Sequence, residues 1–512
     1  MLARVRSAAV LGIDAYLVDV ETDIAQGLPS FATVGLPQGA VREGRERVTA
    51  ALVNSGFAMP LKRITVNLAP ADVPKQGAAF DLPVALGILV ASGQLPRGSL
   101  AATLVLGELG LEGDLRPIRG ALSIALAARG AGLSRLLLPV ANAAEAALVR
   151  GIEVFGTASL AEACGWVDGS RRLLPTTSDV GRIMNCRPAD QVDFTDVRSQ
   201  GSAKRALEVA AAGGHNILLI GPPGAGKTML ARRLPTILPG MALEEALETT
   251  RVHSVAGLLS GQSLKTVRPF RSPHHTISDA GLIGGGVHPR PGEVSLAHGG
   301  VLFLDELPEF RKSVLEVLRQ PLEDGCVTIS RAAMSLTFPA RFMLAAAMNP
   351  CPCGHHGDPT RECRCSPVAV GRYLQRISGP LLDRIDIHLS VPPVTYRDLS
   401  TGDPAESSGA VRRRVERARD HQRRRFRETP GVFANAHMAP RDLRRHCRVS
   451  ASVEQVLRTA ITRLALSARA YHRVLKIART IADLAGSNDI DLPHVREAIQ
   501  YRSLDRGAAV PQ

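Results

Sequence analysis

The chain has 512 residues, which is too long for one ordinary core and predicts three or four domains. Its composition is that of a soluble globular protein, and we expect a cytoplasmic one, because no segment reaches transmembrane length without a charge and Asp14 interrupts the apolar start. Much of the net charge of +14 lies in residues 395–512, which hold 23 lysines and arginines against 13 acidic residues and favour a nucleic-acid partner over a merely solvated basic face.

Residues 1–165 alternate apolar strand-like runs with alanine-rich helical ones, which predicts a self-contained α/β domain. The runs are Ala15–Thr22, Val41–Ser55, Arg63–Leu68, Leu82–Ser92 and Leu115–Ala128. Residues 166–192 are polar with little periodicity, so we expect a linker there.

Two motifs in this first domain, at residues 74–77 and 107–120, resemble the Lon protease domain. The resemblance implies the fold of the second domain of ribosomal protein S5. It fails at the two catalytic positions, because Ala79 stands where the serine nucleophile would be and Leu122 where its lysine partner would be. Without a hydroxyl and a base no acyl-enzyme can form, so we expect no peptidase activity.

A phosphate-binding loop begins the next predicted domain, at 193–395. It follows the apolar run Asn216–Ile220, precedes the helix-like run Met229–Leu234, and comprises Gly221, Pro222, Pro223, Gly224, Ala225, Gly226, Lys227 and Thr228. Between a strand and a helix, successive backbone N–H groups form a concave anion site. Lys227 can then reach the β- and γ-phosphates of ATP, and the Thr228 hydroxyl can hold Mg²⁺.

Two later strands of a doubly wound parallel sheet end in further polar residues. The run Val301–Leu304 is followed by Asp305, which would join the Mg²⁺ shell, and by Glu306, which would orient the attacking water. The run Phe342–Met348 is followed by Asn349, whose amide would lie near the γ-phosphate.

This order of motifs resembles the AAA+ ATPases. Longer motifs at residues 271–275, 291–307 and 377–386 resemble the magnesium-chelatase-type branch, and within it the ComM proteins, a bacterial group tied to natural transformation. The resemblance makes Arg384 the finger that reaches a neighbouring subunit's nucleotide, and Arg469 the second sensor on a helical lid. It implies a homohexamer that acts on branched or single-stranded DNA, a helicase driving branch migration during homologous recombination.

Two alternatives stay open. One is a magnesium-chelatase-type motor subunit that remodels a protein partner, although the Lon-like domain and the cysteine insert argue against it. The other is a non-motor scaffold that binds partners under the control of nucleotide.

Four of the eight cysteines fall within fifteen residues, namely Cys351, Cys353, Cys363 and Cys365. In a cytoplasmic chain such clustering indicates metal before disulfide, and four thiolates can surround one structural Zn²⁺. Free thiols are the alternative, and His355 or His356 could replace one cysteine.

Residues 396–512 repeat apolar residues at helical spacing, which predicts a helical lid domain. Between 412 and 427 nine of sixteen residues are arginines, beginning with Arg412 and Arg413. They either contact DNA phosphates or form salt bridges from the lid to a neighbour. Cys326–Phe338 reads as a hairpin with Arg331 near its tip, either touching DNA in a pore or simply exposed.

Overall fold

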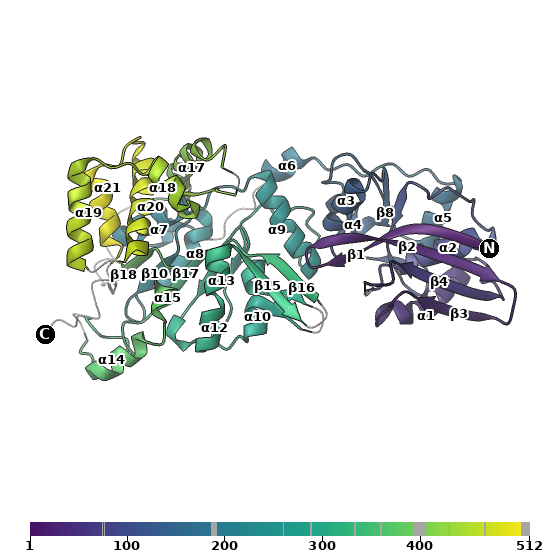
Figure 1. The fold of residues 1–512 in the computed structure, drawn as a ribbon, viewed down its shortest axis with the longest axis horizontal. Helices are drawn as coiled ribbons and strands as arrows, with labels where there is room; N and C mark the ends of the chain where they lie inside the picture. The colour runs from purple at the N-terminus through teal and green to yellow at the C-terminus, as the bar shows by residue number, and fades with distance from the viewer. Residues whose placement is uncertain are drawn as a thin grey trace. The chain divides into compact units, whose positions relative to one another are not determined.

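The computed structural model describes residues 1–512 except 74, 76, 186–191, 260, 287–288, 332–333, 359–360, 394–404, 430, 465–466 and 503–512. It divides into two compact units, each made of several segments, and Figure 1 colours the chain by residue number. Unit 1 comprises Met1–Cys186, Leu243–Thr266 and Ser330–Phe338, and unit 2 comprises Arg187–Ala242, Val267–Ile329 and Pro339–Gln512. Two segments from the predicted ATPase domain thus cluster with unit 1, and the three-domain boundaries stay a prediction.

Unit 1 is built on a seven-stranded sheet in the order β3-β4-β2-β1-β5-β8-β9. Its strands are β1 (Leu2–Leu11), β2 (Asp14–Ala25), β3 (Ser30–Val34), β4 (Arg63–Ala69), β5 (Thr103–Val105), β8 (Arg135–Pro139) and β9 (Glu153–Thr157), and β6 (Glu108–Leu109) pairs separately with β7 (Leu115–Arg116). The β4-β2 and β2-β1 pairs are antiparallel and the others are parallel. Alternating buried and exposed residues in β1 and β4 leave one face for the core.

The helices of unit 1 cover this core. They are α1 (Ala40–Asn54), α2 (Asp81–Ser92), α3 (Ala121–Gly130), α4 (Val140–Ala146), α5 (Leu160–Asp168), α6 (Val180–Asn185) and α9 (Leu243–Ala256). Helix α2 is apolar nearly all round and buried over most of its length, as expected of a helix inside a core. The end of α5 and all of α6 lie within the predicted linker 166–192.

Helix α9 packs against α3 inside unit 1, close to Leu122. The carboxylate of Glu145 accepts a hydrogen bond from the Leu122 amide at 2.8 Å and another from the Ser254 hydroxyl. Burial raises the pKa of Glu145. On the same helix, Arg251 donates to the Ile13 carbonyl at 3.2 Å. The surface around Leu122 therefore binds a segment from the middle of the chain.

Unit 2 holds a five-stranded parallel sheet in the order β11-β14-β17-β10-β18. Its strands are β10 (Ile217–Ile220), β11 (Phe270–Arg271), β14 (Val301–Leu304), β17 (Met343–Met348) and β18 (Ile387–Ser390). Because the strands are parallel, the loops after β10, β14 and β17 leave the sheet at one edge. The predicted α/β class is confirmed.

Helices and short elements surround this sheet. They are η1 (Phe194–Asp196), α7 (Gly201–Gly213), α8 (Lys227–Ile237), α10 (Asp279–Ile283), β12 (Gly284–Gly285), β13 (Arg290–Pro291), α11 (Glu293–Leu296), η2 (Leu307–Glu309), α12 (Lys312–Val317), α13 (Arg319–Asp324), α14 (Pro367–Leu374) and α15 (Gly379–Leu382). Strands β15 (Cys326–Arg331) and β16 (Met334–Pro339) pair as the hairpin that the sequence predicts.

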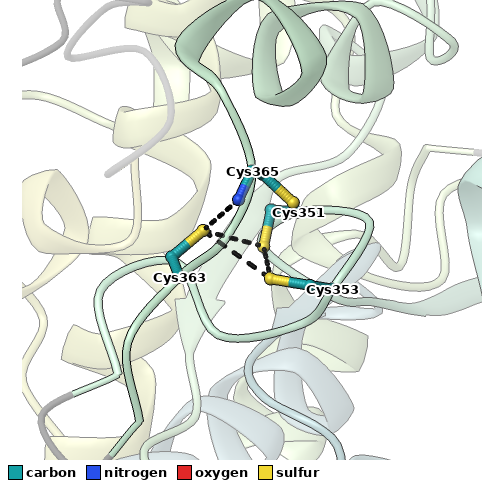
Figure 2. Close-up of side chains that lie close together, drawn as sticks. All are labelled: Cys351, Cys353, Cys363 and Cys365. Atoms are coloured by element: carbon teal, nitrogen blue, oxygen red, sulfur yellow. Dashed lines mark hydrogen bonds between the residues drawn. The ribbon is translucent and has the colours of Figure 1, made fainter.

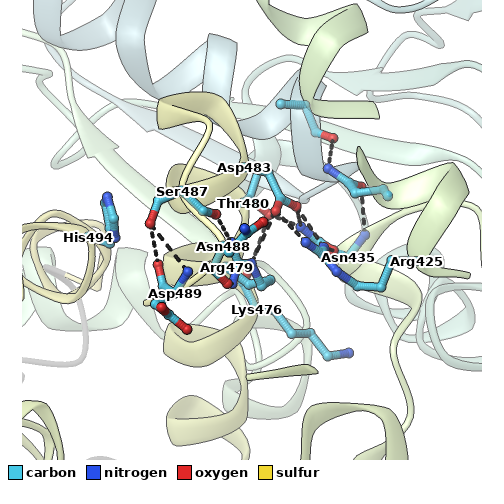
Figure 3. A network of polar contacts seen from close by, with 12 residues as sticks. Arg425, Asn435, Lys476, Arg479, Thr480, Asp483, Ser487, Asn488, Asp489 and His494 are labelled. Carbon is cyan, nitrogen blue, oxygen red and sulfur yellow. Dashed lines mark hydrogen bonds and ion pairs between the residues drawn. The ribbon is translucent and has the colours of Figure 1, made fainter. Parts of the chain in front are cut away.

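The C-terminal part of unit 2 is helical, as predicted, and shares one hydrophobic core with the parallel sheet. It comprises α17 (Ser408–Arg425), η3 (Asn435–His437), α18 (Pro440–His446), α19 (Ala451–Leu464), α20 (Ala468–Ala485) and α21 (Leu492–Gln500). Figure 3 shows a polar network that fastens α17 to α20. Arg425 and Arg479 both donate to the buried carboxylate of Asp483, at 2.8 and 3.1 Å, so the two guanidinium groups share its one negative charge, and Arg479 also donates to the Asn488 carbonyl at 2.6 Å.

Candidate nucleotide-binding site

The phosphate loop connects β10 to α8 through two glycines with left-handed backbone, Gly224 (φ +79°) and Gly226 (φ +80°). Gly221 has no room for a side chain, because a Cβ atom would lie 2.3 Å from the Val391 carbonyl oxygen. Alternation of left- and right-handed residues turns successive N–H groups toward one side, and α8 begins directly after Gly226. The loop therefore has the local geometry of an anion site.

The Lys227 residue is 9% exposed, and its amine is satisfied by three acceptors. Nζ donates to the carbonyl oxygens of Gly221 at 2.7 Å and Pro222 at 2.9 Å, and to Asn349 Oδ1 at 3.1 Å. Burial lowers the pKa of Lys227, against the raising effect of Asp305 and Glu306. The contact with Asn349 brings the residue after β17 to the phosphate loop.

The residues after β14 meet the start of α8. The Thr228 hydroxyl donates to Asp305 Oδ2 at 2.6 Å. Oxygen donors from a hydroxyl and a carboxylate are the ligand set that Mg²⁺ uses beside phosphates, so these two residues fit that ion. Glu306 adopts left-handed backbone (φ +53°) and its side chain is 59% exposed. Such backbone in a non-glycine residue is strained and concentrates at functional sites.

The two arginines assigned from the resemblance lie elsewhere in unit 2. Arg384 follows α15 and pairs with Glu323, and its Nη1 donates to the Pro380 carbonyl at 2.7 Å. Arg469 is exposed in the first turn of α20. Both line one cavity of about 590 Å³ whose lining includes neither the phosphate loop nor Asp305.

The four clustered cysteines converge, as Figure 2 shows. Their sulfur atoms all lie within 4.8 Å of one another, with Cys351 Sγ 3.4 Å from Cys353 Sγ and 3.7 Å from Cys363 Sγ. The pKa of the Cys353 thiol is lowered to about 6, chiefly by a hydrogen bond from the backbone of His355. The cluster could hold a metal ion with sulfur ligands alone.

Neither histidine of this loop is required as a ligand. His355 Nδ1 lies 3.2 Å from the Asp358 carboxylate, and the backbone N–H of His356 donates to Cys351 Sγ at 3.3 Å.

The predicted DNA contacts divide into three cases. Arg412 is half-buried in α17, whereas Arg413 is exposed. The side chain of Arg331 and the hairpin tip at 332–333 lie outside the described residues, so that prediction is untouched.

Other arginines of α17 serve the fold. Arg414 pairs with Glu208 and Glu406, and Arg419 donates to the Phe433 carbonyl at 3.0 Å.

Two further contacts at the site escape the sequence motifs. Gln200, in left-handed backbone (φ +53°), donates through Nε2 to the Ala225 carbonyl at 2.8 Å. His275 Nδ1 lies 3.6 Å from Glu306 Oε2. No spacing rule links either residue to the phosphate loop, although His275 lies within the motif at 271–275 that resembles the magnesium-chelatase-type branch.

No helix among the described residues combines the length and the hydropathy needed to cross a membrane.

Three family models match successive parts of the chain. The model described as "Subunit ChlI of Mg-chelatase" matches residues 20–142, "Magnesium chelatase, subunit ChlI" matches 193–399, and "Magnesium chelatase, subunit ChlI C-terminal" matches 405–502.

Whole-length relatives agree with these models. Competence protein ComM of Haemophilus influenzae is 46% identical over 508 residues, covering 99% of this chain and 98% of that protein. The uncharacterized protein YifB of Escherichia coli is 44% identical over 508 residues, again covering 99% and 98%. A shorter match is to Lon protease 2 of Bacillus subtilis, which is 31% identical over 161 residues, or 28% of this chain and 27% of that protein. The chain therefore belongs to the magnesium-chelatase-like AAA+ family that includes ComM and YifB.

Proposed function

We propose that the protein is a Mg²⁺-dependent ATPase that assembles into a homohexameric ring in the cytoplasm and moves branched DNA. The observation that carries the ATPase proposal is the meeting of Lys227, Thr228, Asp305 and Asn349 at one edge of a parallel sheet. The relative named a competence protein supports a role in natural transformation, where a helicase would drive branch migration during recombination.

Each residue has a role that follows from its position. The Lys227 amine would exchange its carbonyl partners for phosphate oxygens, while Asn349 and the strained Glu306 would place and polarise the attacking water. Thr228 and Asp305 would hold Mg²⁺, which offsets phosphate charge when it is bound. Gln200 fixes the loop from outside by its bond to the Ala225 carbonyl.

Arg384 and Arg469 would act together on the nucleotide of a neighbouring subunit. Both line a cavity whose lining does not include the phosphate loop of their own chain, which supports a role at a neighbouring subunit's site. An arginine supplied from a neighbour stabilises charge in the transition state and makes hydrolysis depend on assembly. Until a nucleotide arrives, Glu323 compensates the Arg384 charge.

Contact with DNA is best supported on α17. Arg413, Arg417 and Arg424 are exposed and spaced by four and seven residues, which places them on one face of the helix. Their partners would be DNA phosphates, because these three arginines offer guanidinium groups and no aromatic ring on which a base could stack.

The cysteine cluster would hold one structural Zn²⁺. Four sulfur ligands within 4.8 Å fill a tetrahedral shell and leave no open position for catalysis.

Substituting the two central residues of the site separates binding from hydrolysis. Lys227→Ala should abolish nucleotide binding and ATP turnover, because it removes the cation that meets the phosphates. Glu306→Gln should still bind ATP but lower turnover by about 100-fold or more, in line with loss of a general base. Turnover, fluorescent-nucleotide binding and strand displacement from three-stranded junctions would be measured. A Glu306→Gln protein with normal displacement would favour the non-motor scaffold, and turnover stimulated only by a chelatase partner would favour the chelatase-type motor.

Mixing inactive proteins tests whether the site forms between subunits. Lys227→Ala and Arg384→Ala should each be inactive alone, whereas an equimolar mixture should recover part of the ATPase activity, because some interfaces then pair an intact loop with an intact arginine. Arg469→Ala should behave like Arg384→Ala. Lack of recovery in subunits shown to exchange would mean that the arginines act within their own chain.

Removing the arginine face of α17 should weaken DNA binding in a salt-dependent way. With Arg413, Arg417 and Arg424 all changed to Ala, the slope of log affinity against log salt should decrease in magnitude by about three, because each lost phosphate contact removes about one. The matched control changes three exposed arginines of α18, Arg441, Arg444 and Arg445. Equal losses in the two triple variants would indicate general charge attraction only.

Metal analysis checks the zinc site. Protein purified without added zinc should contain about one equivalent, and Cys363→Ser should lose most of it, because three sulfurs bind zinc less tightly than four. Cys326→Ser, outside the cluster, should keep the metal. Less than about a tenth of an equivalent in the unaltered protein would leave the cluster as free thiols.

A further inference from the structure

We propose that the four-cysteine cluster is a positioning device for the ATP site, so that loss of its metal impairs nucleotide binding. The proposal rests on the ATPase and zinc proposals above, and it concerns one contact that neither of them uses. The turn that follows the second cysteine lies directly against the phosphate loop.

The contact joins Gly354 to Pro223. Gly354 has left-handed backbone (φ +86°), and a Cβ atom there would lie 2.5 Å from Pro223 Cδ and 2.8 Å from Cγ. These distances are far shorter than any real carbon–carbon contact, so the turn packs on the loop with no space left between them. The Gly354 N–H donates to the Cys351 carbonyl at 3.0 Å, which fixes this turn to the cluster.

Movement of Pro223 would reach the catalytic lysine. The preceding residue, Pro222, provides one of the carbonyl acceptors of Lys227 Nζ, at 2.9 Å. A displaced loop would therefore change both the anion site and the position of the amine that meets the phosphates.

The cluster also holds the segment that carries Asn349. This residue is separated from the fully buried Cys351 by one proline and bonds Lys227 directly. After the last cysteine, α14 returns the chain to the site, where Tyr373 forms a hydrogen bond with the Asn349 backbone. Burial raises the pKa of Tyr373 to about 12, and this hydrogen bond partly counters the increase.

The far end of the same segment is tied to the residues that follow Glu306. Arg376 Nη1 donates to the Pro308 carbonyl at 3.2 Å and to the Glu309 carboxylate at 3.0 Å. Both ends of the segment from Asn349 to Arg376 thus contact catalytic elements. Its described part between Asn349 and Cys365 contains no helix or strand, so a metal held by four thiolates would be its principal cross-link.

Two glycines of this segment provide a matched test. Gly354 and Gly357 both have left-handed backbone (φ +86° and +77°), but a Cβ atom at Gly357 would meet nothing within 4 Å. Alanine at either position carries the same backbone strain and leaves all four cysteines in place. Only Gly354→Ala pushes on the phosphate loop.

The experiment measures zinc content, kcat and KM for ATP in both variants and in the unaltered protein. Both variants should keep zinc. Gly354→Ala should raise KM by about tenfold, since a small displacement of positioning groups has large effects, while Gly357→Ala stays within about twofold. A defect that only reduces the amount of folded enzyme lowers apparent kcat and leaves KM unchanged. Equal KM values in the two variants would overturn the proposal.

A second arm covers the case in which Gly354→Ala fails to fold. Zinc is withdrawn from the unaltered protein with a thiol-compatible chelator, and binding of a fluorescent ATP analogue is followed against the zinc that remains. Affinity should fall in step with zinc, and unchanged affinity in zinc-free protein would overturn the proposal. Absence of ATP turnover and binding in the unaltered protein would refute the ATPase proposal instead, which keeps the two failures distinguishable.

Discussion

The hydrogen bonds of the Lys227 amine hold together three segments that are distant in sequence. Because a buried cation needs acceptors, Nζ takes two carbonyl oxygens from its own loop and the Asn349 side chain from the neighbouring strand. Under the proposed function, the same amine would give up these partners for phosphate oxygens. Nucleotide binding would then be an exchange of acceptors in a site that is already assembled, and contacts behind the loop would matter to it for that reason.

Arg384 and Arg469 line a different part of unit 2 from the contacts of this amine. The phosphate loop, Asp305 and Asn349 gather at the edge of the parallel sheet, whereas Arg384 and Arg469 line another cavity of unit 2. The helical lid shares its core with the sheet and is fastened by the Asp483 network, so Arg469 is carried on a well-packed element. Under the proposed assembly, a closed interface would bring these arginines to a neighbour's phosphates.

Local patterns predicted the parts of the site that depend on local structure. The loop Gly221–Thr228 and the pair Asp305 and Glu306 follow buried strands, and parallel pairing brings strand ends together whatever the side chains are. The convergence of four cysteines likewise follows from their close spacing. The contact of Gly354 with Pro223 joins residues 131 positions apart through a glycine whose φ no composition rule reveals.

The roles of charged residues are the hardest to predict from the sequence alone. Nine arginines between 412 and 427 look alike as letters, but Arg414, Arg419 and Arg425 bind carboxylates or carbonyls inside unit 2. Their role is to satisfy the fold, and they are poor candidates for DNA contact because their donors are already engaged. Only the tertiary packing of α17 separates them from the exposed face of Arg413 and its neighbours.

Unit 1 contains a second buried charge that needs donors. Leu122, which stands where the resemblance to the Lon protease domain would place a lysine, donates its amide to this group. Its Glu145 carboxylate receives the Leu122 amide and the Ser254 hydroxyl of α9, a helix that the chain inserts between α8 and β11 of unit 2. Since a buried carboxylate is costly without donors, α9 and unit 1 stabilise each other. The surface around Leu122 thus binds a segment from the middle of the chain through the Glu145 carboxylate.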